Sequence, residues 1–324
     1  MATRPSRLVP LAVLALLLIV GGALGAWWLQ PKRVERAVTL YYLDPQGMYL
    51  VPVTERLSLP GSRKAALQAA LKELIDEVPP GLMAAVPPGS QVEVHGLSDG
   101  KAEVSLKIAD GALGSGGEQM LAGALVRTAA TAEAIQEVKL SLMDSKGGPW
   151  QSEHLDLTHP LTTTDPGMEN LYLSEGSGLT VTVYYRLPNS DYLVPLSIPL
   201  PPKRQNEPLK GSFALLRQGP PSDLQTFLVP SLDPRTDLRW NGVEGDVAQV
   251  LWKNAPEATP SELAIRATVL TLTETGRIKA VQFKREGAPL SVKVGPFDLS
   301  QPIRRPDAVN TLPDKVSLAP GFAA

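Results

Sequence analysis

One short segment near the middle of the chain combines residue types that bind metal ions. Residues 153–159 read EHLDLTH and hold two imidazoles and two carboxylates. In an extended strand, His154 and Asp156 would lie on one face, and with His159 they could hold zinc with one open position for water. Such a site would support metal-dependent hydrolysis. Because no other cluster of ligand residues is expected to converge there, we interpret the segment as a solvated edge strand leaving the first domain, and we predict no metal site.

A glycine-rich stretch offers a second candidate, for anion binding. Gly114 to Gly117 read GSGG and precede a helical pattern, so their backbone N–H groups could seat an anion at a helix N-terminus. A phosphate loop would carry a following lysine, whereas here Glu118 follows and would repel phosphate. We therefore interpret the stretch as the start of a helix.

The remaining polar motifs favour structural roles. Asp99-Gly100 and Glu244-Gly245 are typical of hairpin turns, and we expect His95 at the end of a strand, in a structural or exposed position. With three histidines in the whole chain, a Ser-His-Asp triad has little support. We predict no catalytic or cofactor-binding residue.

Composition excludes several further classes of function. The 324 residues carry a net charge of −2 without a clustered positive excess, which argues against nucleic-acid binding. The absence of cysteine excludes disulfides, thiol nucleophiles, zinc–thiolate sites and a lipid-modified cysteine. The length fits two domains, each able to bury its own core.

A tandem duplication determines the domain organisation. Residues 38–53 read VTLYYLDPQGMYLVPV and residues 181–196 read VTVYYRLPNSDYLVPL, with nine of 16 positions identical at an offset of 143. Self-similarity at a fixed offset indicates a repeated structural unit. We expect a segment order of N-terminal tail, anchor, linker, first repeat, linker, second repeat and mobile Pro-rich tail, with the bounds 1–7, 8–29, 30–36, 37–160, 161–179, 180–300 and 301–324.

Each repeat has the pattern strand, strand, helix, strand, strand, helix, strand. Alternating apolar residues predict the strands, and apolar residues spaced by three and four predict the helices. Ser62 is expected to cap the first helix, and Pro208 to start the shorter helix of the second repeat. Helices covering one face of a mixed sheet would give an α/β, two-layer α+β fold. In the pairs Tyr41/Tyr42 and Tyr184/Tyr185 we expect one ring in the core and one facing outward, where it could serve an interface.

The N-terminus carries a long apolar run. Leu8–Leu29 holds 22 uncharged residues, enough to cross a bilayer as one helix, and ends in tryptophans suited to the membrane interface. We predict a single-pass anchor with both repeats outside the cytoplasm, since a large region after a short N-terminal tail is usually translocated. The alternative is a cleaved signal peptide, with Ala23 and Gly25 as the small residues before the cleavage site.

Several motifs in order resemble the GerMN domain family of sporulation and germination proteins. They are VTLYYLD…YLVPV, ALKELIDEVPPGLMAAVPPGSQV, DGKAEVSL, GGEQMLAGALVRT and VKLSLMD, spanning residues 37 to 144, with a degraded second copy through about residue 285. The resemblance implies a fold similar to the ring-building motifs of secretion systems. It also implies an extracytoplasmic role with the channel complex between mother cell and forespore. Members are often lipoproteins, so this chain, without cysteine, would use Leu8–Leu29 as its anchor instead.

Three hypotheses follow. The main one is a non-enzymatic, membrane-anchored assembly protein whose GerMN domains pack with protein partners of that channel complex, or with themselves, at the outer forespore membrane. The alternative is an extracytoplasmic accessory module of a sensor kinase or of another cell-envelope assembly. The third is the metal-dependent hydrolase that would use His154, Asp156 and His159.

Overall fold

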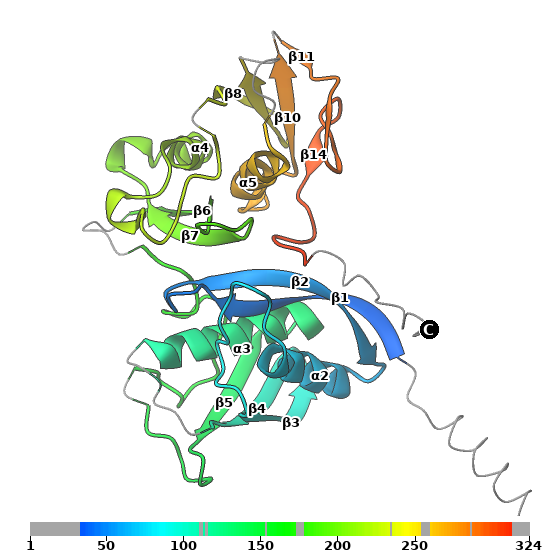
Figure 1. Cartoon of the computed structure of the whole chain (residues 1–324), viewed down its shortest axis with the longest axis vertical. Coiled ribbons are helices and arrows are strands. Elements are labelled where there is room, and N and C mark those ends of the chain that lie inside the picture. The colour runs from blue at the N-terminus through cyan, green and yellow to red at the C-terminus, as the bar shows by residue number, and fades with distance from the viewer. Residues whose placement is uncertain are drawn as a thin grey trace, which may run out of the picture.

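The computed structural model describes residues 33–109, 113, 116–152, 154–172, 178–233, 235–253, 260–285 and 287–312. Leu8–Leu29 lies outside these residues, and among those described no helix has the length and apolarity needed to cross a membrane. Two mixed α/β units follow one another along the chain (Figure 1). The tandem repeat therefore determines the architecture.

The first repeat has the predicted order of elements. They are β1 (Arg33–Leu43), β2 (Leu50–Pro60), α2 (Arg63–Asp76), β3 (Gln91–Ser98), β4 (Lys101–Lys107), α3 (Gly117–Glu133) and β5 (Glu137–Met143). β1 and β2 form an antiparallel hairpin, while β4 pairs antiparallel with β3 and parallel with β5.

The second repeat follows the same order and adds short strands at its end. Its elements are β6 (Thr180–Arg186), β7 (Leu193–Pro199), α4 (Pro208–Gln218), β8 (Leu238–Glu244), β9 (Val247–Trp252), α5 (Glu262–Thr273) and β10 (Ala280–Arg285), then β11 (Ala288–Pro289), β12 (Lys293–Val294), β13 (Phe297–Asp298) and β14 (Ile303–Arg304). β9 pairs antiparallel with β8 and parallel with β10, and β14 adds to the far edge of β10.

The layering differs from the expected two-layer unit. Among the described strands, the hairpin of each repeat is a sheet of its own and forms no ladder with the following three strands. Figure 1 shows α2 and α3 between the β1–β2 hairpin and the β3–β4–β5 sheet, and contacts of α2 with β2 and β3 agree. The helices thus bury two faces instead of one.

The start of α2 confirms the cap predicted at Ser62, and α5 has an equivalent serine cap. Ser62 Oγ accepts a hydrogen bond from the N–H of Ala65, and Ser261 Oγ accepts one from the N–H of Ala264. These serines satisfy N–H groups that lack a partner in the first helical turn. Pro208 starts α4, which is shorter than α2 at 11 residues against 14.

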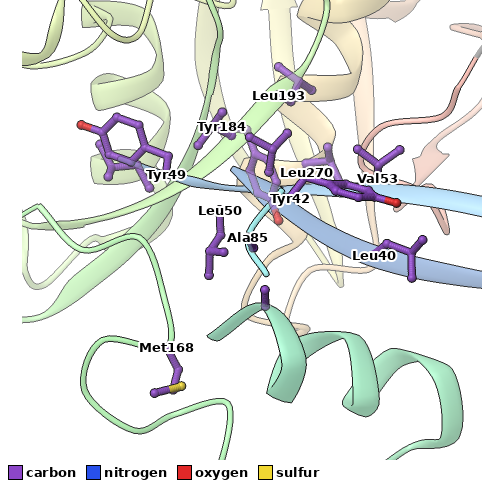
Figure 2. Packing of buried hydrophobic residues seen from close by; sticks show 14 of the residues in the cluster. Leu40, Tyr42, Tyr49, Leu50, Val53, Ala85, Met168, Tyr184, Leu193 and Leu270 are labelled. Carbon is purple, nitrogen blue, oxygen red and sulfur yellow. The ribbon is translucent and has the colours of Figure 1, made fainter. Parts of the chain in front are cut away.

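Each hairpin is covered on both faces near its turn, because its second face meets the other repeat. Leu40 and Tyr42 of β1 point to the core of the first repeat, and strand β2 contacts strand β7 across the seam. The buried apolar residues of both repeats form one continuous cluster, part of which is shown in Figure 2. The two repeats therefore share one hydrophobic core.

A glycine in α3 allows close packing at the edge of this cluster. A Cβ atom at Gly123 would lie 2.9 Å from Leu50 Cδ1 and 3.5 Å from Met168 Cα. Real Cβ atoms do not approach so closely, so a larger residue at this position would force the Leu50 side chain to shift.

Three expected boundaries change in the structure. β1 begins at Arg33, inside the expected linker 30–36, because four extra residues at the end of β2 pair with it. In the expected linker 161–179, Met168 and Asn170 are buried. In the expected tail 301–324, the described residues 301–312 include β14 and the buried Asn310, so this part is packed and is not a mobile tail.

Candidate functional site

The seam between the repeats is built by two segments that each follow a repeat. We call residues 161–172 the first arm and residues 301–312 the second arm. Each arm lies between the two hairpins and contacts strands of both repeats. Figure 1 shows the hairpins β1–β2 and β6–β7 facing one another at this seam.

One asparagine of the first arm joins both hairpins. The N–H of Leu50 donates to Asn170 Oδ1 at 2.7 Å. Asn170 Nδ2 donates to the carbonyl of Leu50 at 2.8 Å and to the carbonyl of Pro195, in the other repeat, at 2.8 Å. A buried amide side chain thereby satisfies three buried backbone groups.

An asparagine of the second arm makes the reciprocal set of bonds. The N–H of Leu193 donates to Asn310 Oδ1 at 2.7 Å, and Asn310 Nδ2 donates to the carbonyls of Leu193 at 2.8 Å and Pro52 at 2.7 Å. Leu50 corresponds to Leu193, and Pro52 to Pro195, at the repeat offset of 143. Exchange of equivalent contacts is the mark of a two-fold interface, here within one chain. We call these two residues the asparagine clamp.

The main chain of each arm repeats the same exchange. The N–H of Thr54 donates to the carbonyl of Asn310 at 2.7 Å, and the N–H of Ser197 donates to the carbonyl of Asn170 at 2.8 Å. Thr54 and Ser197 are again 143 residues apart. Each arm therefore adds one bridge to the second hairpin strand, β2 or β7, of the opposite repeat.

Two arginines flank the clamp and cover equivalent tyrosines. The guanidinium carbons of Arg127 and Arg305 each lie 5.8 Å from a ring centre, of Tyr41 and of Tyr184 respectively. Burial raises the pKa of Tyr41, and the Arg127 cation opposes this shift. Burial and then the carboxylate of Glu274, which accepts from the Tyr184 hydroxyl at 2.7 Å, raise the pKa of Tyr184. Both phenols stay protonated near neutral pH.

A cavity of about 180 Å³ lies beside these groups. Its lining includes charged and aromatic residues from both repeats: Tyr41, Arg127, Glu169, Tyr184, Glu274 and Arg305. Arg305 pairs with Glu274 at 2.6 Å, and Arg127 donates to main-chain carbonyls of the first arm, including that of Thr163 at 3.4 Å. These contacts hold the seam together, and the protonated tyrosines are unsuited to act as bases near neutral pH.

Comparison with known proteins identifies the family. The Germane family, described as sporulation and spore germination, matches residues 39–146 and 182–291. These two ranges are the two repeats and cover well over half of the chain. The chain belongs to the Germane family.

Two known proteins extend this result. The Germane chain is 27% identical over 293 residues to the spore germination protein GerM of Bacillus subtilis (strain 168), covering 84% of this chain and 77% of that protein. It is also similar to the solved tandem GerMN domains of the sporulation protein GerM from Bacillus subtilis, with a TM-score of 0.62 at 22% identity, over 86% of this chain and 99% of that one. The second likeness confirms the tandem fold.

The histidine segment of this Germane chain lies in a loop, so the expected edge strand is wrong. His154, Asp156 and His159 are exposed, and no cluster of three or more His, Asp or Glu side chains suited to a metal occurs in the described part of the chain. Asp156 Oδ1 accepts from the N–H of Thr158 at 2.9 Å. Hydrogen bonds from Thr158 lower the pKa of Asp156, so its carboxylate serves a local turn.

The glycine-rich stretch leads into α3, as predicted. Gly114 and Ser115 lie outside the described residues, and α3 begins at Gly117. Glu118 accepts from Trp150 Nε1 at 2.8 Å and from Ser152 Oγ at 2.6 Å. Burial alone would raise the pKa of Glu118, but these bonds outweigh burial and lower it. This carboxylate holds the loop that follows β5.

The remaining candidate residues, in two hairpin turns and at His95, have structural roles. Asp99-Gly100 and Glu244-Gly245 turn the hairpins β3–β4 and β8–β9, as predicted. His95 lies within β3, not at its end, and its Nε2 is 2.7 Å from Ser105 Oγ. These groups do not converge on one another.

The structure confirms that one ring of each tyrosine pair lies in the core and the other at an interface, and it shows which surface the second ring meets. Tyr42 and Tyr185 are fully buried in their own repeats, whereas Tyr41 and Tyr184 lie at the seam. The surface that the second ring of each pair meets is thus the other half of the same chain.

Sequence analysis missed the asparagine clamp altogether. Both arms have few apolar residues, and neither shows a helical or strand period. One signal was present: Pro166 precedes Asn170 by four residues, and Pro306 precedes Asn310 by four residues. This shared spacing, at an offset of 140, shows that the duplication includes the arms.

Proposed function

We propose that this Germane protein is a non-enzymatic, membrane-anchored extracytoplasmic protein of spore formation or germination. Its two GerMN domains would pack in or onto the channel complex that joins mother cell and forespore. Family membership and the likeness to a spore germination protein support the sporulation role.

The asparagine clamp is the observation that best supports an assembly role. It couples two homologous repeats into one body whose outer faces keep a fixed relation to each other. A subunit that packs beside partners benefits from such pre-organisation, because less conformational freedom is lost on association.

The proposed membrane anchor rests on the sequence, and the proposed non-enzymatic role rests on the pairing of charged groups in the seam. The 22 uncharged residues of Leu8–Leu29 are long enough for a single-pass anchor. In the seam, charged groups pair with each other or with main-chain carbonyls. We propose on this basis that the protein binds partners and does not catalyse a reaction.

Deletion and complementation in the source organism test the proposal. We expect a deletion strain to grow normally and to lose most heat-resistant spores, with recovery by the full chain but not by residues 30–324 alone. Normal spore counts in the deletion strain would refute the sporulation role. A defect confined to envelope-stress signalling would favour the accessory module of a sensor kinase instead.

A further inference from the structure

The two repeats differ at one corner, where a helix meets the edge of a sheet. In the first repeat, α2 closes against β3. Gln68 Nε2 donates to the carbonyl of Val92 at 2.7 Å, and the N–H of Val94 donates to Gln68 Oε1 at 2.7 Å. The side-chain amide of Gln68 therefore occupies the β3 edge as a neighbouring strand would.

A buried carboxylate completes the same corner. Glu133, at the end of α3, pairs with Arg36 of β1 and with Arg63 of α2, the latter at 3.2 Å. Arg63 Nη2 also donates to the Glu133 carbonyl at 2.7 Å. These contacts join β1, α2 and α3.

The second repeat has apolar or small residues at three of the four matching positions, while Arg63 corresponds to Arg204 at an offset of 141. At the offset of 143, Leu179 replaces Arg36 and Gly276 replaces Glu133. At the offset of 141 that aligns the paired prolines after each first helix, Leu209 replaces Gln68. α4 also begins four residues later than α2 in this alignment, at Pro208, after a short 3-10 turn at Pro202–Arg204.

These replacements leave an open groove of about 610 Å³ in the second repeat. Its apolar lining comes from β6, α4, β8 and the end of α5: Leu179, Val181, Leu209, Trp240, Val243 and Ile278. Leu179 is 47% exposed and Val243 is 42% exposed. A volume of this size with a mainly apolar lining is typical of binding sites.

The edge of β8 offers main-chain groups to this groove. β8 is the last strand of its sheet, and the carbonyl of Asp237 accepts from Lys253, on the β9 side. Because main-chain groups alternate in direction along a strand, those of Leu238 and Trp240 face away from β9. The N–H of Leu238 donates to the carbonyl of Thr236 at 3.0 Å, which leaves the carbonyl of Leu238 and the N–H of Trp240. No side chain in the described ranges bonds to them, since Leu209 stands where Gln68 stands in the first repeat.

The lining of the groove carries two carboxylates, Glu207 and Glu274, and two cations, Lys210 and Arg277. Glu207 pairs with Lys210 at 3.0 Å and Glu274 pairs with Arg305 at 2.6 Å. Arg277 lines the groove and has no ion-pair partner among the residues that the structure describes. The carboxylate that fills this corner in the first repeat has no counterpart here.

We infer that this groove docks an extended segment of a partner protein that carries an aliphatic or aromatic anchor and a nearby Asp or Glu. The segment would pair with the edge of β8, place its anchor between Leu209 and Trp240, and set its carboxylate against Arg277. It would supply from outside what Gln68 and Glu133 supply inside the first repeat. Addition of a strand to a free sheet edge is a common mode of peptide recognition. The inference concerns partner binding and does not depend on membrane anchoring or on the channel complex.

Site-specific photocrosslinking in the source organism tests this inference on the full chain. A photoreactive phenylalanine would replace Val243 in the groove, or, as the control, the exposed Val292 of the same repeat. We expect a discrete protein adduct from position 243 that mass spectrometry maps to a segment with an acidic residue. The double variant Leu179→Arg with Leu209→Gln, which copies the first repeat, should reduce this adduct about tenfold and leave the control position unchanged.

A second measurement uses the mapped segment as a synthetic peptide. Its dissociation constant for the purified full chain should rise about two- to fivefold in Arg277→Ala, the range for an exposed ion pair. Any of three results would overturn the inference: no protein adduct from position 243, an adduct that persists in the double variant, or an adduct with the mass of a lipid. Thermal unfolding of each variant checks that the fold is kept.

Discussion

Replacement of Asn310 by alanine tests whether the seam couples the two repeats. Asn310 is 2% exposed, and its side chain makes three hydrogen bonds to main-chain groups of β2 and β7. Each such bond contributes about 1 kcal/mol net, and a buried group left without a partner costs about 1–3 kcal/mol. We therefore expect Asn310→Ala to lower the free energy of unfolding by about 3–5 kcal/mol.

Asn170→Ala should have a similar effect, because Asn170 makes the equivalent three bonds. The measurement is urea unfolding of the purified chain, followed by tryptophan fluorescence and by circular dichroism. Asn206→Ala is the matched control, since Asn206 is exposed, and it should change the free energy of unfolding by less than about 0.5 kcal/mol.

The shape of the unfolding curve carries further information. If the asparagine clamp couples the repeats, the wild-type chain should unfold in one transition that both probes report at the same urea concentration. The double variant Asn170→Ala with Asn310→Ala should separate this into two transitions. A loss below about 0.5 kcal/mol in both single variants would refute the role assigned to the clamp.

Three other predictions concern tyrosine ionisation, the histidine loop and the membrane. Burial and then Asp44 raise the pKa of Tyr49 to about 12. The contribution of Tyr49 to stability is therefore complete below pH 10 and is lost as the pH rises toward 12. In urea unfolding from pH 8 to 12, the free energy of unfolding should fall less in Tyr49→Phe than in wild type. His154→Ala and His159→Ala should leave the thermal midpoint within about 2 °C of wild type, and the zinc content of all three proteins should be at background. Stoichiometric zinc in the wild-type protein that is lost in both variants would contradict this prediction. Removal of residues 1–29 should move the protein from the membrane pellet to the supernatant after alkaline extraction, whereas retention in the pellet would contradict the anchor.

Sequence patterns predicted the elements of each repeat well, because these elements depend on local periodicity. The alternation in Val38–Leu43 and the apolar spacing in Leu67–Ile75 determine a strand and a helix whatever surrounds them. Ser62 could be assigned as a cap for the same reason, since its partner lies three residues away.

The arrangement of the sheets could not be predicted in the same way. The apolar residues of the hairpins are compatible with a central position in one mixed sheet. They are equally compatible with a separate layer between the helices and the other repeat, which is what the structure shows. Periodicity reports that a face is buried and does not report what covers it.

The asparagine clamp could not be predicted from the sequence for another reason. Its energy comes from two polar side chains that bond to main-chain groups 120 and 117 residues away. Polar residues in Pro- and Gly-rich segments are typical of turns and linkers, so Asn170 and Asn310 carried no sign of burial. Only the duplication of the Pro-x-x-x-Asn spacing distinguishes the arms from ordinary linkers.

Imaging of the protein through the developmental cycle of the source organism tests the proposed function most directly. A fluorescent protein that folds outside the cytoplasm would be fused after Ala324. The account predicts a signal that appears only in sporulating cells and collects around the engulfed forespore. A uniform envelope signal in growing cells would contradict the sporulation role.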